Sequence, residues 1–337
     1  MYRLYGVRDD EVMPPVSVIR VARRDDPVSA VTEDDAARRA VDYPTVRLGG
    51  PLFGHAEELA DGRWRLDALD EYTPQGARDA LAERLRIRRT TVTEPALAAE
   101  LDAVGDVLDW EKVDEVTVAG RRYRIVRTDT FARFGADGPE PPRPTDPDPL
   151  PPGGAGADPG RTEGLVVSPD EPTGLAHALL KAEVLTAHYP RSGVPAQVYA
   201  DSVRAVRTHP GAVILPTRYA VAEYVDGRWQ PDSAAVASPQ AARDLMTFGF
   251  RYLVPRLRTP TAAETRAYAR AAADVDATRA DEVTVLGRRF RVTRIEILLR
   301  FGVDGPEGPR PSDHDPEPPP EAHCAHLRAQ GLLPDPE

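Results

Sequence analysis

The stretch DEVTVAGRRYR at residues 114–124 returns as DEVTVLGRRFR at residues 281–291, and these two segments decide the expected fold. In each, two short runs rich in strand-forming residues flank a dipeptide that reverses the chain, Ala119-Gly120 or Leu286-Gly287. A two-residue reversal between such runs is typical of a β-hairpin. We therefore expect the same antiparallel hairpin twice in one chain.

The register of this hairpin separates buried side chains from exposed ones. Because side chains alternate along a strand, pairing across the reversal places Val116 opposite Tyr123 on the core face and Glu115 opposite Arg124 on the solvent face. The second copy repeats this scheme with Val283 opposite Phe290 and Glu282 opposite Arg291. The tyrosine and the phenylalanine are thus expected in the core.

The basic runs GRRYR and GRRFR resemble phosphate-binding motifs with an aromatic residue interleaved. The register already gives one arginine of each run a carboxylate, and it leaves Arg122 and Arg289 without an obvious partner. The whole chain has 43 basic and 54 acidic residues and a net charge of −11, which repels a phosphate backbone. Nucleic acid is therefore not an expected partner.

The repeated hairpin is part of a longer internal duplication. Asp61 of the motif DGRW recurs 165 residues later as Asp226, and Asp114 recurs 167 residues later as Asp281. Further matches are YP at 43–44 and 189–190, PQxARD at 74–79 and 239–244, RFG at 133–135 and 300–302, and DGPE at 137–140 and 304–307. The sequence predicts an α+β protein of two homologous repeats, each an antiparallel sheet with packed helices, related by a pseudo-twofold.

Each repeat also contains a second expected hairpin and a helix start. The dipeptides Asp61-Gly62 and Asp226-Gly227 favour tight turns, which give the cross-strand pairs Leu59 with Trp64 and Tyr224 with Trp229. A hydroxyl before a proline indicates a capped helix, and this pattern stands at Thr73-Pro74 and Ser238-Pro239. If the two YP motifs correspond, the second repeat has an insertion around residues 191–210.

The composition and these motifs divide the chain into five segments. We expect an N-terminal extension at 1–15, a first repeat domain at 16–138, a Pro- and Gly-rich linker at 139–164, a second repeat domain at 165–305, and a Pro-rich tail at 306–337. With one cysteine no intramolecular disulfide can form, and no apolar run approaches the length that spans a bilayer. These features favour a cytoplasmic protein.

The polar residues that recur without an obvious packing role are the candidates for a binding site. They are Arg78-Asp79 with the counterpart Arg243-Asp244, Arg133 with Arg300, and Arg143 and Asp146 with Arg310 and Asp313. The candidate ligand-binding residues among them are Arg78, Arg243, Arg133 and Arg300. One hypothesis makes them clamps for an anion, and the other makes them structural ion pairs that brace turns and arms. No phosphate-binding loop and no catalytic motif accompanies them, so we assign no catalytic residue and expect no cofactor.

The tail contains a cluster of metal-binding residue types. His323, Cys324 and His326 could hold zinc or nickel together with His314. A proline-rich acidic segment without a second cysteine pair is a poor metal site, so these residues remain weak candidates and we expect no metal.

The ordered set of motifs resembles an actinobacterial family that is a domain of unknown function with two internal repeats. The resemblance covers residues 16–149 and 165–320. It implies a bacterial, cytoplasmic origin and carries no activity, cofactor or site residue to transfer to this chain.

Two main hypotheses of function follow from these observations, beside a less favoured third, a transcriptional or nucleic-acid accessory factor. The first is a non-enzymatic protein-binding or scaffolding module whose partner is another protein, bound through the proline-rich arms. The alternative is an enzyme or binding protein for an anionic small molecule in the cleft between the two repeats. The sequence leaves open whether the chain has any activity and which oligomeric state it adopts.

Overall fold

The computed structural model describes residues 18–22, 26–154 and 162–334. The elements of its first half are α1 (Pro27–Asp42), β1 (Thr45–Glu58), β2 (Trp64–Glu71), α2 (Pro74–Thr91), α3 (Pro95–Trp110), β3 (Glu115–Val118), β4 (Arg121–Gly135) and β5 (Gly138–Pro139). The next are β6 (Val166–Val167), α4 (Leu175–Val184), α5 (Ala196–Thr208), β7 (Gly211–Val225), β8 (Arg228–Pro231), α6 (Pro239–Phe248), the π-helical turn η1 (Gly249–Leu253) and α7 (Val254–Leu257). The chain continues through α8 (Ala262–Thr278), β9 (Glu282–Val285), β10 (Arg288–Gly302), β11 (Gly305–Pro306) and α9 (Pro320–Ala329). The fold class is therefore α+β, as expected.

The strands of both halves join in one sheet, with all strand pairs antiparallel. Its order is β6-β2-β1-β4-β10-β7-β8, and β3 and β5 pair with β4 while β9 and β11 pair with β10. The halves meet where β4 and β10 pair, with Asp129 opposite Leu298 and Phe131 opposite Glu296. The sheet thus runs without a break from one half into the other.

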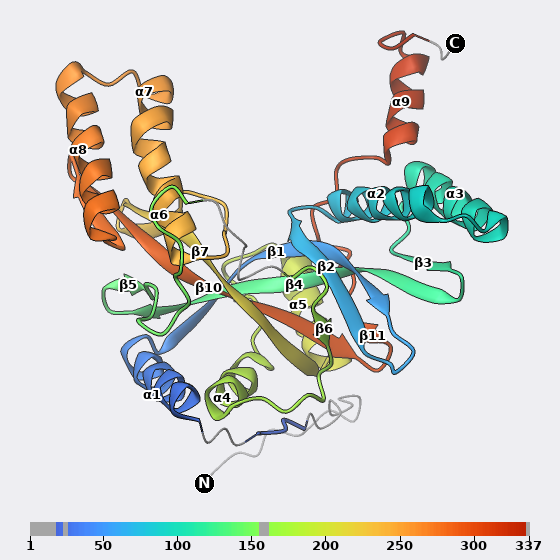
Figure 1. The fold of residues 1–337 in the computed structure, drawn as a ribbon, viewed down its shortest axis with the longest axis horizontal. Helices are drawn as coiled ribbons and strands as arrows, with labels where there is room; N and C mark the ends of the chain where they lie inside the picture. The colour runs from blue at the N-terminus through green and yellow to red at the C-terminus, as the bar shows by residue number, and fades with distance from the viewer. Residues whose placement is uncertain (1–17, 23–25, 155–161, 335–337) are drawn as a thin grey trace.

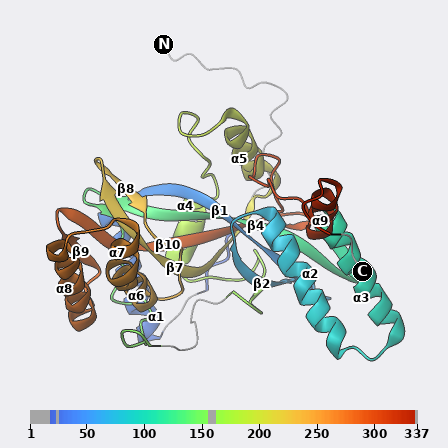
Figure 2. The same cartoon turned by 90° about the horizontal axis from the view of Figure 1, so that it is seen from above.

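Helical hairpins cover the two ends of one sheet face. Figures 1 and 2 show α2 and α3 over one end and α6 to α8 over the other, with α1 and α4 on the opposite face. Under α2 and α3 the core contains Phe53, Leu81 and Leu85, and under α6 and α8 it contains Phe250 and Phe290. None of the helices in the described ranges is long and apolar enough to cross a bilayer.

Several local expectations are confirmed. Val116 pairs with Tyr123 and Glu115 with Arg124, and the second hairpin and the Tyr224–Trp229 pair also have the expected register. Positive φ at both turn residues accounts for this agreement in the reversals at Ala119-Gly120, Asp226-Gly227 and Leu286-Gly287. The Thr73 and Ser238 side chains cap α2 and α6, with the prolines in the first turn.

The register at the first tryptophan was predicted wrongly. Trp64 lies opposite Glu58, not Leu59. The reversal is longer than two residues because Leu59 N–H donates to the carbonyl of Arg63, and positive φ occurs at Gly62 but not at Asp61. The Asp61 carboxylate accepts from the Arg63 backbone N–H at 3.1 Å, which stabilises this wider loop.

The match between the two YP motifs was also wrong. Tyr43 ends α1 directly before β1, whereas Tyr189 follows α4 and precedes α5. The residue that ends a helix directly before β7 is His209, with φ −127° and ψ 70° against −123° and 67° at Tyr43. The segment at 191–210, expected as an insertion, therefore contains α5 in the place that α1 has in the first half.

The two halves exchange contacts through the arms that follow β5 and β11. Asp146 pairs with Arg294 of the other half at 3.2 Å, and Asp313 pairs with Arg127 at 3.0 Å. In the same way β11 reaches the first half, where Gly305 lies against the Trp64 ring. Residues 139–148, which we expected to be linker, are thus an arm docked on the protein.

A buried charge cluster lies beside the seam of the two halves. The Asp129 carboxylate contacts Arg127 at 2.7 Å and Arg310 at 3.1 Å, and Tyr189 Oη donates to it at 3.4 Å. Burial opposes ionisation, but the two guanidinium groups outweigh it and lower the pKa of Asp129 to about 2. The carboxylate is therefore charged inside the protein.

Candidate functional site

Arg78 and Arg243, two of the predicted binding residues, hold the exchanged arms. Arg78 donates to Asp114 at 2.7 Å and to Asp315 at 2.8 Å. Arg243 donates to Asp281 and to Asp148, both at 2.7 Å. Each guanidinium thus joins a carboxylate of its own half to a carboxylate on the arm of the other half. This arrangement matches the structural hypothesis for the pair.

Arg133 and Arg300 are buried and also occupied by the protein itself. Arg300 is 1% exposed and donates to the backbone carbonyls of Val184, Leu185 and Ala187 at 2.7 to 3.1 Å. Arg133 donates to the Tyr43 carbonyl at 3.3 Å and pairs with Glu183. A ligand at either site would have to displace these contacts, so ligand binding by this pair stays a prediction.

The weak metal candidates of the tail lie on one short helix. His323, Cys324 and His326 belong to α9, where His326 Nε2 lies 2.8 Å from the amide nitrogen of Gln330. In the part of the chain that the structure describes, no group of three or more His, Cys, Asp or Glu side chains is placed to hold a metal ion.

A pocket of about 540 Å³ lies between the two halves, where the alternative hypothesis placed an anion site. Its walls include Arg143 of the first arm together with Arg243 and Arg291 of the second half. All three guanidinium groups already pair with carboxylates at 2.6 to 2.7 Å. An anion that enters this pocket would therefore have to compete with a carboxylate at each of these three arginines.

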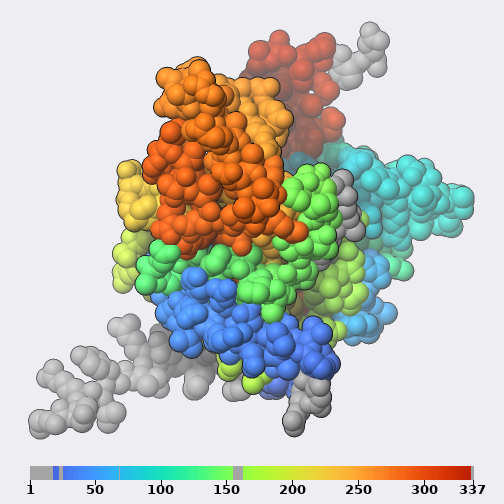
Figure 3. Space-filling model, turned by 60° about the vertical axis from the view of Figure 1, so that its left-hand side comes forward, coloured from blue at the N-terminus to red at the C-terminus, as the bar shows by residue number. Residues whose placement is uncertain are grey.

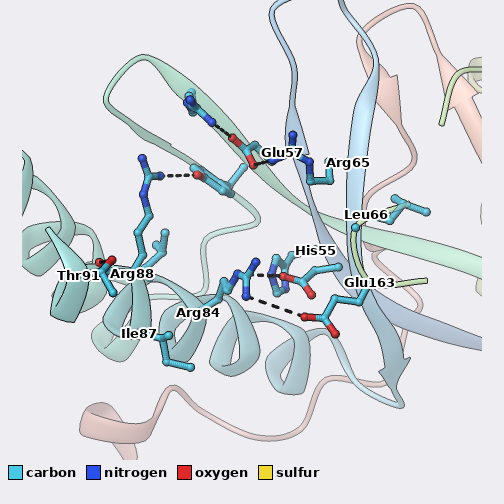
Figure 4. Close-up of a pocket in the computed structure, with 14 residues that line it drawn as sticks. His55, Glu57, Arg65, Leu66, Arg84, Ile87, Arg88, Thr91 and Glu163 are labelled. Carbon is cyan, nitrogen blue, oxygen red and sulfur yellow. Dashed lines mark hydrogen bonds and ion pairs between the residues drawn. The ribbon is translucent and has the colours of Figure 1, made fainter. Parts of the chain in front are cut away.

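A second pocket, of about 610 Å³, opens between the β1–β2 hairpin and α2 (Figure 4). We call it the arginine pocket, because four arginines line it, together with three carboxylates and one histidine. The charged residues are Arg65, Arg84, Arg88, Arg121, Glu57, Asp67, Glu163 and His55, and the others include Leu66, Leu85, Ile87, Thr91 and Tyr123. Its formal charge is +1 with a neutral histidine, in a chain whose net charge is −11.

Regular secondary structure places these side chains on the same wall. His55 and Glu57 are two residues apart on β1 and therefore point to one face of the sheet. Arg84 and Arg88 are four residues apart on α2 and share one helix face, while Leu81 and Leu85 anchor the helix in the core.

The inner part of the pocket is a chain of charged contacts. His55 Nε2 lies 3.1 Å from Asp67 Oδ2, and the same oxygen lies 3.3 Å from Arg84 Nε. A second nitrogen of Arg84 lies 4.0 Å from Glu163 (Figure 4). His55 is 5% exposed, and its Nδ1 is buried with no hydrogen-bond partner among the described residues. The second ring nitrogen, Nδ1, is therefore not accessible from the pocket.

The outer part contains arginines of two kinds. Arg65 and Arg121 share the carboxylate of Glu57, at 3.2 and 2.5 Å. Arg88 instead donates to the hydroxyl of Tyr123 at 2.7 Å, and no carboxylate of the described residues lies within ion-pair distance of it. Burial, reinforced by Glu57, raises the pKa of Tyr123, so this hydroxyl stays protonated. Arg88 is therefore the cation of the pocket that lacks an acidic partner.

Sequence reasoning missed this pocket because its residues come from five separate segments of the chain. One signal was available within the repeated motif, since Tyr123 of the first copy is Phe290 in the second. The hydroxyl that Tyr123 adds is the group that contacts Arg88.

A family model described as "Family of unknown function (DUF5954)" matches residues 26–316 of the chain. No curated protein and no solved structure matches it.

Proposed function

We propose that this chain, which belongs to the DUF5954 family, is a binding protein that takes an anionic small molecule in the arginine pocket. The observation that carries the proposal is Arg88, a pocket-lining guanidinium held by a neutral hydroxyl instead of a carboxylate. An arginine in this state keeps donors for a carboxylate or phosphate, for which its planar fork is suited.

The lining also indicates the kind of molecule. A volume of about 610 Å³ falls in the range of small-molecule sites. Leu66, Leu85 and Ile87 supply an apolar wall beside the arginines. The pocket therefore suits an anion that carries an apolar or aromatic part.

Binding fits the pocket better than catalysis. The His55–Asp67 pair is of a type that activates nucleophiles, but such a base needs its second nitrogen within reach of substrate. In His55 that nitrogen is buried, and the hydroxyls lining the pocket belong to Thr91 and to Tyr123, whose pKa is raised. The described pocket thus presents no activated nucleophile.

A comparison of the two halves supports the proposal. We infer that they are homologous repeats related by a pseudo-twofold, since their hairpins share registers and their arms exchange equivalent contacts. Under this inference the pocket positions change in the second half, where the counterparts of His55, Arg84, Arg88 and Tyr123 are Val221, Gly249, Leu253 and Phe290. The polar set is therefore not required to build the module.

The test is binding of phenyl phosphate, benzoate and inorganic phosphate, measured by titration calorimetry on the full chain. The variant Arg88→Gln removes the free charge, whereas Arg89→Gln removes a charge of the same helix that pairs with Asp102 outside the pocket. We expect at least one aromatic anion to bind wild type and Arg89→Gln alike, and to bind Arg88→Gln about tenfold more weakly. Equal binding to Arg88→Gln, or no binding of any probe to wild type, would show that the pocket is not an anion site.

A further inference from the structure

The helical hairpin of the second half carries an exposed apolar surface. Four large side chains between residues 248 and 257 are at least 45% exposed, and the most exposed, Leu257, reaches 78%. The set is Phe248, Tyr252, Leu253 and Leu257, and the rings of Phe248 and Tyr252 lie 5.1 Å apart. Figure 3 shows this hairpin, in orange, standing out from the body of the molecule. We call these four residues the hairpin patch.

A local change of helix geometry lies within the patch. Residues 249–253 form a π-helical turn in which Val254 N–H donates to the carbonyl of Gly249. The turn keeps Phe250 in the core, 5.0 Å from the Phe290 ring, while Tyr252 faces solvent. The corresponding helix of the first half, α2, is an uninterrupted α-helix. Single π turns within α-helices are frequent at functional sites.

Two arginines that make no ion pair within the described residues lie beside the patch. Arg256 and Arg258 flank Leu257, and neither side chain makes an ion pair or hydrogen bond with any residue that the structure describes. Asp232 acts on Arg258 only through a longer-range electrostatic interaction. Of the three acids of α8, Glu264 caps its own helix and Asp276 pairs with Arg251, and the third, Asp274, makes no ion pair with either arginine. On the first-half hairpin, by contrast, Arg86 and Arg89 pair with acids of the neighbouring helix.

We infer that the hairpin patch and these arginines dock an acidic amphipathic helix of a partner protein. Apolar side chains of such a helix would cover the patch, and its carboxylates would reach Arg256 and Arg258. Tyrosine, phenylalanine and arginine are the types enriched at the centre of protein interfaces. A protein partner fits better than an anionic bilayer, because the net charge of −11 repels an extended negative surface.

The test uses the full chain and three probes. The first is a fluorescent amphipathic peptide helix with leucines on one face and glutamates beside them, the second has lysines in place of the glutamates, and the third is a vesicle containing phosphatidylglycerol. The variants are Leu257→Ser, the double variant Arg256→Glu with Arg258→Glu, and the control Arg207→Glu at an exposed arginine of α5.

We expect the acidic peptide to bind wild type and the Arg207→Glu control equally, by fluorescence anisotropy. Each patch variant should weaken this binding about tenfold, and the charge-reversed variant should prefer the lysine peptide. Hydrogen exchange should slow at residues 248–258 when the acidic peptide binds.

Three outcomes would overturn the inference. These are equal affinity for the acidic and lysine peptides, unchanged affinity in both patch variants, and vesicle flotation without peptide binding. The result is independent of the arginine pocket, because Arg88→Gln should leave peptide binding unchanged.

Discussion

The contact of Gly305 with the Trp64 ring gives a sharp test of how the two halves join. Replacing Gly305 with alanine would put a Cβ atom 2.7 Å from Trp64 Cζ2, inside the closest approach that two carbon atoms tolerate. Trp64 is 3% exposed, so the ring has little space to retreat. The φ angle of Gly305, +115°, is also one that L-residues rarely adopt.

These two effects set the size of the loss. A forced positive φ costs about 2 kcal/mol. Overpacking against a fixed ring adds about 2 kcal/mol more. The expected loss for Gly305→Ala is then about 4 kcal/mol, which for a chain of 337 residues corresponds to about 6 °C in Tm.

Two other glycines separate these contributions. Gly62 has φ +82° but nothing within 4 Å of an added Cβ, so Gly62→Ala should lose about 1 kcal/mol from backbone strain alone. Gly50 has neither feature, and Gly50→Ala should be close to neutral.

The measurement is urea denaturation followed by tryptophan fluorescence, with thermal melting as a second readout. The reasoning predicts the order Gly305→Ala, then Gly62→Ala, then Gly50→Ala in loss of stability. If Gly305→Ala lowers the free energy of unfolding by no more than Gly62→Ala does, β11 does not pack on Trp64. The contact of the second half with the first at this tryptophan would then be refuted.

Three further outcomes are expected. Because the pKa of Asp129 is about 2 in the folded protein against an ordinary 3.8, its contribution of about 2 kcal/mol is present above about pH 4 and is lost as the pH falls towards 2. Urea denaturation across this range should show the loss of stability, and the variant Asp129→Asn should flatten that part of the pH profile. Near neutral pH the same variant should cost about 4 kcal/mol, because the buried guanidinium groups lose their partner. The variants Asp148→Asn and Asp315→Asn should each lose about 1 kcal/mol in thermal melting, and a loss in one alone would contradict equivalent arms. Leu298→Ala should cost about 3 kcal/mol in the same assay, because Leu298 is fully buried at the seam, and a loss below 1 kcal/mol would contradict that packing.

Short-range sequence signals predicted the hairpins well. The dipeptides at 119–120, 226–227 and 286–287 adopt positive φ at both positions, and the pairings around them follow. The same reasoning failed at Asp61-Gly62, where the backbone N–H of Arg63 finds the Asp61 carboxylate and a longer loop results. A side chain that competes for backbone donors is not visible in the turn dipeptide itself.

Long-range partners could not be predicted in this way. The expectation that Arg122 and Arg289 lack a partner is wrong. Within its own hairpin Arg122 pairs with Glu115 and Arg289 with Glu282, and each also pairs with an acid of the other half, Asp304 or Asp137. The register of a single hairpin holds no information about an arm more than 150 residues away along the chain. The same limit applies to the arginine pocket, because His55, Arg88 and Glu163 share no local spacing.

The crossed arms also govern the order in which the chain can complete its structure during synthesis. When the first half leaves the ribosome, Arg78 and Arg127 have no Asp315 and no Asp313 to bind, because these acids are made more than 180 residues later. At the pace of translation this delay lasts tens of seconds. The nascent first half must therefore persist in an unfinished form, with cationic side chains open to other anions, until the second arm arrives.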